Sequence, residues 1–132
     1  MTAQEALTLA KQVGFDPALQ QAIIKSNDPE WAYRFAHDIA EADLDALEPV
    51  VLQSDHPRVV YDFALLKGER GGAVGELEEF IIQAGDPGLM ILFAADIHGA
   101  DIERFADVLQ RHGNPKYFQL FEAEMKQRGI EV

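Results

Sequence analysis

The chain has 132 residues, 48% of them hydrophobic and 26% charged, which is typical of one folded soluble domain rather than a disordered chain. Its 11 Lys and Arg and 23 Asp and Glu give a formal net charge of −12, which argues against nucleic acid or an anionic membrane as a direct partner. The absence of cysteine excludes disulfides, thiolate nucleophiles and cysteine-bound metals, and no apolar run reaches the ~18 residues of a membrane span.

The first part of the chain predicts two short helices. Thr2 and Glu5 have the spacing of a capping box ahead of the first helix, and Gly14 suits its end. Asp16 followed by Pro17 predicts the start of a second helix, because aspartate accepts from first-turn amides and proline is favoured at the first helical position.

A similar segment then occurs four times, as SNDPEWAYRFA, SDHPRVVYDFA, AGDPGLMILFA and HGNPKYFQLFE. Its prolines are 28, 30 and 28 residues apart, and a period of this size is typical of stacked supersecondary units. Each proline follows a capping residue, except where His56 stands in that place, and precedes a phenylalanine by six residues. We therefore expect a helix to begin at each of Pro29, Pro57, Pro87 and Pro115, with its phenylalanine (Phe35, Phe63, Phe93, Phe121) in the core.

A second helix is expected before each of these prolines, because apolar residues recur there at helical spacing. The linkers DIAEAD and DIHGAD each end in an aspartate placed to cap that helix, whereas the middle repeat has the looser KGERGGAVGE. Pro49 falls inside one such helix, which must therefore either kink or restart there. The last helix is expected to run to about Gln127 and to finish near Gly129.

These features predict an all-α protein of about nine short helices, with one repeat domain over residues 1–132. The pattern resembles the helical-hairpin repeat superclass that includes HEAT, armadillo and tetratricopeptide proteins, over essentially the whole chain. The period is shorter than the roughly 33 to 47 residues usual in those families, and the tetratricopeptide tryptophan and glycine pattern is absent. The resemblance implies an α-solenoid of about four hairpins and, by analogy, a binding role.

Few residues suggest catalysis. Asp96, His98, Asp101 and Glu103 are close enough in sequence to converge on a metal ion, but Asp101 already suits a helix cap and Glu103 suits a solvated first turn. Ser26 and Ser54 lie in turns before repeat prolines, where a turn or capping role is favoured over nucleophilic catalysis. The glycines near residues 68–75 lack the lysine and the preceding strand of a phosphate-binding loop.

The acidic residues are the main functional signal. From Glu41 to Asp107 there are 15 acidic and four basic residues. Because a solenoid places equivalent positions side by side, we expect carboxylates on the second helices and at their starts to form a stripe across three repeats. Two tyrosines that share a repeat position on the first helices form a further candidate face. The predicted partner-binding residues are Asp43, Asp45, Glu48, Glu76, Glu78, Glu79, Asp101, Glu103, Asp107, Tyr33 and Tyr61.

The charge and the repeats favour a non-enzymatic module that presents this stripe to a basic protein partner. One alternative is a small acidic inhibitor that mimics nucleic acid and blocks a nucleic-acid-binding enzyme. Another, less favoured, is a metal-dependent hydrolase that uses Asp96, His98 and Asp101. We expect no cofactor and no direct contact with nucleic acid or membrane. The absence of cysteine favours a reducing, cytoplasmic location, and the N-terminus lacks the basic start and apolar stretch of a secretory signal.

Overall fold

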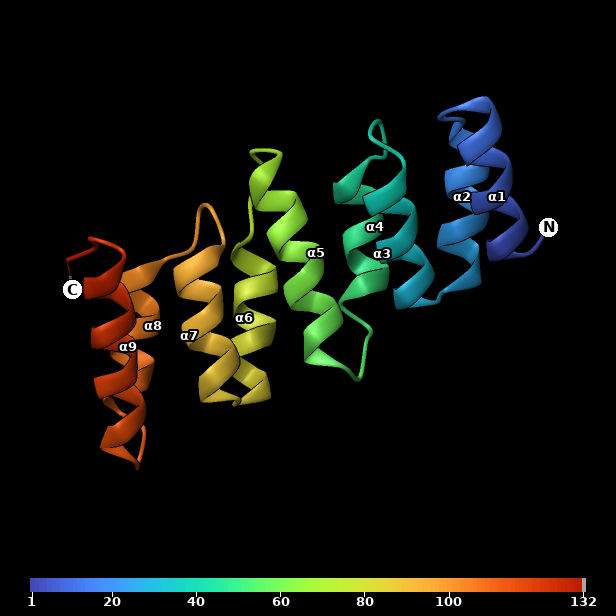
Figure 1. Ribbon diagram of the computed structural model, residues 1–132. Helices are drawn as coiled ribbons and strands as arrows, with labels where there is room; N and C mark the ends of the chain where they lie inside the picture. The colour runs from blue at the N-terminus through green and yellow to red at the C-terminus, as the bar shows by residue number, and fades with distance from the viewer. Residues whose placement is uncertain (132) are drawn as a thin grey trace. The chain divides into compact units, whose positions relative to one another are not determined.

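The computed structural model describes residues 1–131, which form nine helices and no strand. The all-α prediction and the expected number of helices are confirmed over that range (Figure 1). Within it, none of the helices has the length and apolarity needed to cross a membrane. The helices are α1 (Ala3–Val13), α2 (Pro17–Ser26), α3 (Pro29–Asp38), α4 (Leu44–Val51), α5 (Pro57–Glu69), α6 (Gly75–Ala84), α7 (Pro87–Asp96), α8 (Ile102–Gln110) and α9 (Pro115–Gln127).

Side-chain caps fix where most of the helices begin. At α1 the predicted capping box is present, with Thr2 Oγ1 accepting the Glu5 N–H at 3.1 Å and Glu5 Oε1 accepting the Thr2 N–H at 3.2 Å. Such a cap contributes about 1 kcal/mol to helix stability. Six other helices begin with a carboxylate or amide oxygen that accepts a first-turn N–H, from Asp16, Asp28, Asp43, Asp86, Asp101 and Asn114.

The turn before α5 is held by a serine instead. His56 stands there where the other proline-led helices have aspartate or asparagine. Ser54 Oγ accepts the His56 N–H at 2.9 Å and donates to the His56 carbonyl at 3.2 Å. The turn role predicted for Ser54 is confirmed.

The repeated phenylalanines are core residues, as predicted. Phe35, Phe63, Phe93 and Phe121 are all 0% exposed. Burying a phenylalanine side chain contributes about 1.5–3 kcal/mol, so these four positions account for much of the apolar stabilisation of the proline-led helices.

The chain divides into two compact units, Met1–Phe63 and a second unit from Ala64 onward, with the division inside α5. In the first unit each of α1 to α3 contacts the next helix, and α1 and α2 also contact α3 and α4, respectively. In the second unit α6 contacts α7, α7 contacts α8 and α9, and α8 contacts α9. Contacts with the next and the next-but-one helix are the local pattern of stacked hairpins.

Helix α4 runs from Leu44 to Val51 with Pro49 inside it, so of the two alternatives, a kink or a restart, the restart does not occur. Proline has no N–H for the helical bond to the carbonyl four residues earlier. Helix α4 ends two residues later, at Val51. The ring of Pro49 is exposed, so no packing in the core compensates for the missing bond.

We expect Pro49→Ala to raise the free energy of unfolding by about 1–2 kcal/mol. Alanine restores the N–H and the helix propensity, and the greater freedom of the unfolded chain offsets part of this gain. Urea unfolding followed by circular dichroism measures the change. Pro87→Ala is the matched control, because Pro87 is at the first position of α7 and needs no N–H there. An equal gain in both variants would contradict the explanation.

A close backbone contact fixes α5 against the linker between α7 and α8. A Cβ atom at Gly68 would lie 2.5 Å from the carbonyl oxygen of His98. No L side chain fits at that distance unless the linker moves. Gly68 lies in the last turn of α5, so the first glycine of the KGERGGAVGE segment belongs to a helix rather than to a loop.

Gly68→Ala is expected to lower the free energy of unfolding by about 1–3 kcal/mol, the usual cost of overpacking. Gly75→Ala serves as its control, because a Cβ at Gly75 meets no atom within 4 Å. That substitution in the first turn of α6 should leave stability unchanged or raise it by less than about 1 kcal/mol. Thermal and urea unfolding of both variants would show the difference, and equal effects would refute the contact as its cause.

Candidate functional site

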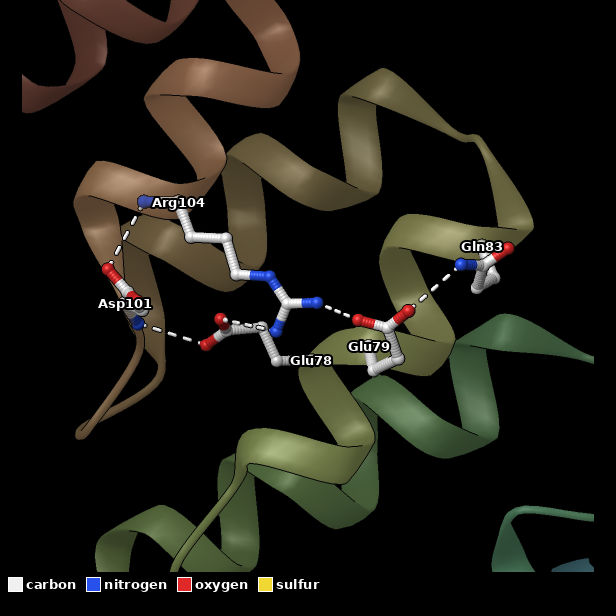
Figure 2. A network of polar contacts seen from close by, with 5 residues as sticks. All are labelled: Glu78, Glu79, Gln83, Asp101 and Arg104. Atoms are coloured by element: carbon white, nitrogen blue, oxygen red, sulfur yellow. Dashed lines mark hydrogen bonds and ion pairs between the residues drawn. The ribbon is translucent and has the colours of Figure 1, made fainter.

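A buried glutamate joins the first turn of α6 to the start of α8. Glu78 is only 2% exposed. Its Oε2 accepts the backbone N–H of Asp101 at 2.9 Å. The Asp101 side chain caps α8 by accepting the Arg104 N–H at 3.1 Å. Both the N–H and the carboxylate of Asp101 therefore position the beginning of α8 (Figure 2).

One arginine of α8 reaches two glutamates of α6. Arg104 Nη1 donates to Glu78 Oε1 at 3.5 Å, and Arg104 Nη2 forms an ion pair with Oε2 of Glu79. Glu79 also accepts from Gln83 Nε2 at 2.9 Å. Figure 2 shows the arginine extending from α8 between these carboxylates. One cation thus serves Glu78, Glu79 and the nearby Asp101, so the network keeps a negative charge.

The environment of Glu78 favours its protonated form. Burial raises the pKa of Glu78 above its ordinary value, and the Asp101 N–H and the Arg104 guanidinium counter this only in part. Because the folded pKa exceeds the unfolded one, the favourable contribution of Glu78 to stability is present below the unfolded pKa. It is lost as the pH rises through the folded pKa.

Exposed carboxylates lie on the same two helix starts. Glu76 in α6 and Glu103 in α8 are exposed and make no ion pair among residues 1–131. Asp107, one turn further along α8, pairs with Arg111 at 3.3 Å. We call the exposed or half-buried carboxylates at these starts the α6–α8 acidic surface, which consists of Glu76, Glu79, Asp101 and Glu103.

The first unit contains an equivalent helix start. Asp43 caps α4 by accepting the Ala46 N–H at 3.3 Å, and Asp45 is exposed in the first turn. The Asp43 N–H donates to Oε1 of Gln20 on α2 at 2.9 Å, and Gln20 is 6% exposed. The two starts correspond residue by residue at a separation of 58 positions: Gln20 with Glu78, Asp43 with Asp101, Asp45 with Glu103, and Ala46 with Arg104.

The chemical type of the buried acceptor, carboxylate or amide, matches the presence or absence of a cation on the later helix. Where α8 supplies Arg104, the buried acceptor is the carboxylate of Glu78. Where α4 has Ala46, the acceptor is the neutral amide of Gln20. A buried carboxylate without a cation would be costly, whereas an amide accepts the same N–H without that cost.

Several predicted partner-binding residues are not on the surface. Glu48, Glu78 and Tyr61 are buried, so none of them presents its side chain to a partner. The Arg58 guanidinium lies 5.0 Å from the centre of the Tyr61 ring. Tyr33 is half-buried, with its ring 5.9 Å from that of His37. Asp43 and Asp45 belong to the first unit and the α6–α8 acidic surface to the second, so a stripe across three repeats stays a prediction.

The buried acceptor was missed because acidic residues were assigned to the surface. Its position, nine residues before each repeat proline, is occupied by Gln20, Glu48, Glu78 and Ala106. Polar residues at three of these four places, beside the apolar stripe of each helix, are the signal that identifies it.

The residues considered for metal binding have other roles. Asp96 pairs with Arg128 at 2.7 Å, and Asp101 caps α8. In the part of the chain that the structure describes, no group of three or more His, Asp or Glu side chains is arranged to hold a metal ion. The hydrolase alternative therefore gains no support from the geometry of Asp96, His98 and Asp101.

Comparisons with protein-family models, curated proteins and solved structures found no match to this chain. The relation to the helical-hairpin repeat superclass thus stays a resemblance, which rests on the repeat and on the helix contacts within each unit. Function must be inferred from the surfaces of the chain itself.

Substitutions at Glu78 test the role of the buried acceptor. We expect Glu78→Ala to lower the free energy of unfolding by about 1–3 kcal/mol, because the part-buried Asp101 N–H loses its acceptor. Glu78→Gln keeps an acceptor oxygen and should stay within about 1 kcal/mol of the original chain at neutral pH, as Gln20 does the same work in α2.

The pH dependence provides the control for that pair. Raising the pH from about 4 to 7 should destabilise the original chain relative to Glu78→Gln, because only the original chain must ionise a buried carboxyl. Urea unfolding at each pH measures this difference. A difference independent of pH, or a Glu78→Gln variant as unstable as Glu78→Ala, would contradict the assignment.

Proposed function

We propose that this chain is a non-enzymatic binding module that holds a basic protein partner on the α6–α8 acidic surface. The observation that carries the proposal is the exposure of Glu76 and Glu103 and their lack of an ion-pair partner among residues 1–131. Arg104 of α8 is already shared by Glu78 and Glu79. Two carboxylates on linked helix starts are therefore available to a cationic partner.

The rigidity of these helix starts supports the proposal. The hydrogen bond from the Asp101 N–H to Glu78 and the guanidinium of Arg104 link α6 to α8 (Figure 2). Carboxylates held on linked elements lose little freedom when a partner binds.

Electrostatic steering toward such a surface speeds association and weakens with salt. The partner is expected to contribute Lys or Arg, with apolar contacts supplying part of the affinity. The inhibitor alternative uses the same surface, and it differs only in the class of partner, a nucleic-acid-binding enzyme.

Charge reversal at the two available carboxylates tests the proposal. The bait is the full chain, and a lysate of its source organism is the pool of partners. Glu76→Lys with Glu103→Lys should abolish capture of a basic protein that the original chain retains, or weaken it at least tenfold. Raising the salt from about 50 to 300 mM should also weaken capture.

The matched control is Glu69→Lys with Glu122→Lys. It changes the net charge equally, at exposed glutamates that likewise make no ion pair among the described residues and lie outside the α6–α8 acidic surface. This control should retain the partner. Equal loss in both variants, or no basic protein captured even at low salt, would refute the proposal. Competition by DNA or RNA for the captured partner would favour the inhibitor alternative.

A further inference from the structure

The start of α6 lies against the linker between α7 and α8. A Cβ atom at Gly99 of that linker would be 3.8 Å from Cγ2 of Val74, the residue before α6. Two residues further along, the Asp101 N–H donates to Oε2 of Glu78 at 2.9 Å. The exposed Glu76 stands between Val74 and Glu78 in the chain, so a buried carboxyl group lies next to the α6–α8 acidic surface.

Both oxygens of this carboxyl group face donors at the start of α8. Oε2 of Glu78 accepts the Asp101 N–H, and Oε1 accepts from Arg104 Nη1 at 3.5 Å (Figure 2). An ionised carboxylate can accept at both oxygens, whereas a protonated one carries a hydrogen on one of them. The carbonyl oxygen can keep the Asp101 N–H, but the hydroxyl then faces the guanidinium, which has no acceptor. Protonation of Glu78 therefore removes its contact with Arg104.

The charge at these helix starts depends on the same proton. The α6–α8 acidic surface together with Glu78 and Arg104 has five carboxylates and one guanidinium, a formal charge of −4, and protonation of Glu78 leaves −3. It also leaves the guanidinium of Arg104, until then shared by two carboxylates, to Glu79 alone. A surface in that state attracts a cation less strongly.

We propose that a proton on Glu78 regulates the α6–α8 acidic surface, which holds a basic partner when Glu78 is ionised and releases it when Glu78 is protonated. This inference rests on the proposed function of that surface. A cationic partner favours the ionised form, so binding releases a proton from Glu78, and by linkage a proton weakens the hold on the partner. Burial raises the pKa of Glu78, which places the release at a higher pH than the roughly 4.3 of an ordinary glutamate.

Other charged groups lie on the elements around Glu78. Helix α7 packs on α6 and has one charged residue, Asp96, which pairs with Arg128 at 2.7 Å. Helix α5 precedes α6 and has Lys67 and Glu69 in its last turn. The linker carries His98, which is exposed and gains a positive charge in acid. Protonation of His98 has the same sign of effect on a cationic partner, so the experiments separate it from Glu78.

Titration of Glu78, followed by ¹³C NMR of its side-chain carboxyl group, tests the coupling without a partner. Glu76→Gln with Glu103→Gln removes the two available carboxylates, as a bound cation would neutralise them. The titration midpoint of Glu78 should fall by about 0.3–1 pH unit, because nearby like charge favours the protonated form. Glu69→Gln with Glu122→Gln is the matched control and should leave the midpoint in place.

Calorimetric titration of the full chain with a hexalysine peptide, in about 50 mM salt and from about pH 4.5 to 7, tests the regulation itself. In the His98→Gln background, which removes the imidazole, the affinity should fall about threefold or more as Glu78 becomes protonated. The fall should coincide with the midpoint measured by NMR. Adding Glu78→Gln should abolish most of this change and give the weaker affinity already at pH 7. Circular dichroism checks that both variants are folded.

The two levels of the proposal fail in different ways. If hexalysine does not bind the original chain, or binds Glu76→Lys with Glu103→Lys equally well, the proposed function of the surface is wrong and its regulation with it. If hexalysine binds on that surface but the Glu78→Gln variant keeps the full pH dependence, the regulation alone is overturned. An unchanged midpoint of Glu78 in Glu76→Gln with Glu103→Gln would also overturn the regulation alone.

Discussion

A part-buried hydrogen bond from the capping residue of one helix to a buried side chain two helices earlier recurs in both units. In α2 the acceptor is Gln20, and in α6 it is Glu78; each receives an N–H from the aspartate 23 residues later. That N–H belongs to a capping residue and has no partner within its own helix. The side-chain oxygen satisfies it and fixes where the later helix starts relative to the earlier one. The orientation of the first-turn carboxylates on α4 and α8 depends on this bond.

Much of the fold could be predicted because its signals are local. A capping side chain and the proline after it act within a few residues, so most helix starts could be placed without knowledge of packing. Periodic apolar residues likewise identified Phe35 and its equivalents as core. The sequence could not show that α4 continues through Pro49, because the low helix propensity of proline opposes a continuous helix. Helix α4 continues because its other residues, among them Leu47 and Val50, are buried in the tertiary packing.

The candidate site was less predictable, since it depends on contacts between distant segments. Glutamate is usually exposed. Nothing near Glu78 in sequence reveals that it accepts a hydrogen bond from the N–H of Asp101, 23 residues later. Comparison of Gln20 with Glu78 at one repeat position gives that information only once the register of the repeats is known. Part of the acidic pattern is also explained by helix stability and needs no partner, because carboxylates in a first turn interact favourably with the helix dipole. The binding proposal therefore rests on fewer residues than the sequence suggested.

The correspondence between Gln20 with Ala46 and Glu78 with Arg104 limits how this chain could be shortened, lengthened or recombined. A hairpin transplanted with its glutamate but without the arginine 26 residues later would carry a charged group into the interior with nothing to neutralise it. The natural exchangeable module is therefore not the hairpin between two prolines. It is the segment from the first turn of one second helix (α2 or α6) to the first turn of the next (α4 or α8). Crossovers placed outside that segment keep each acceptor with its matching neighbour.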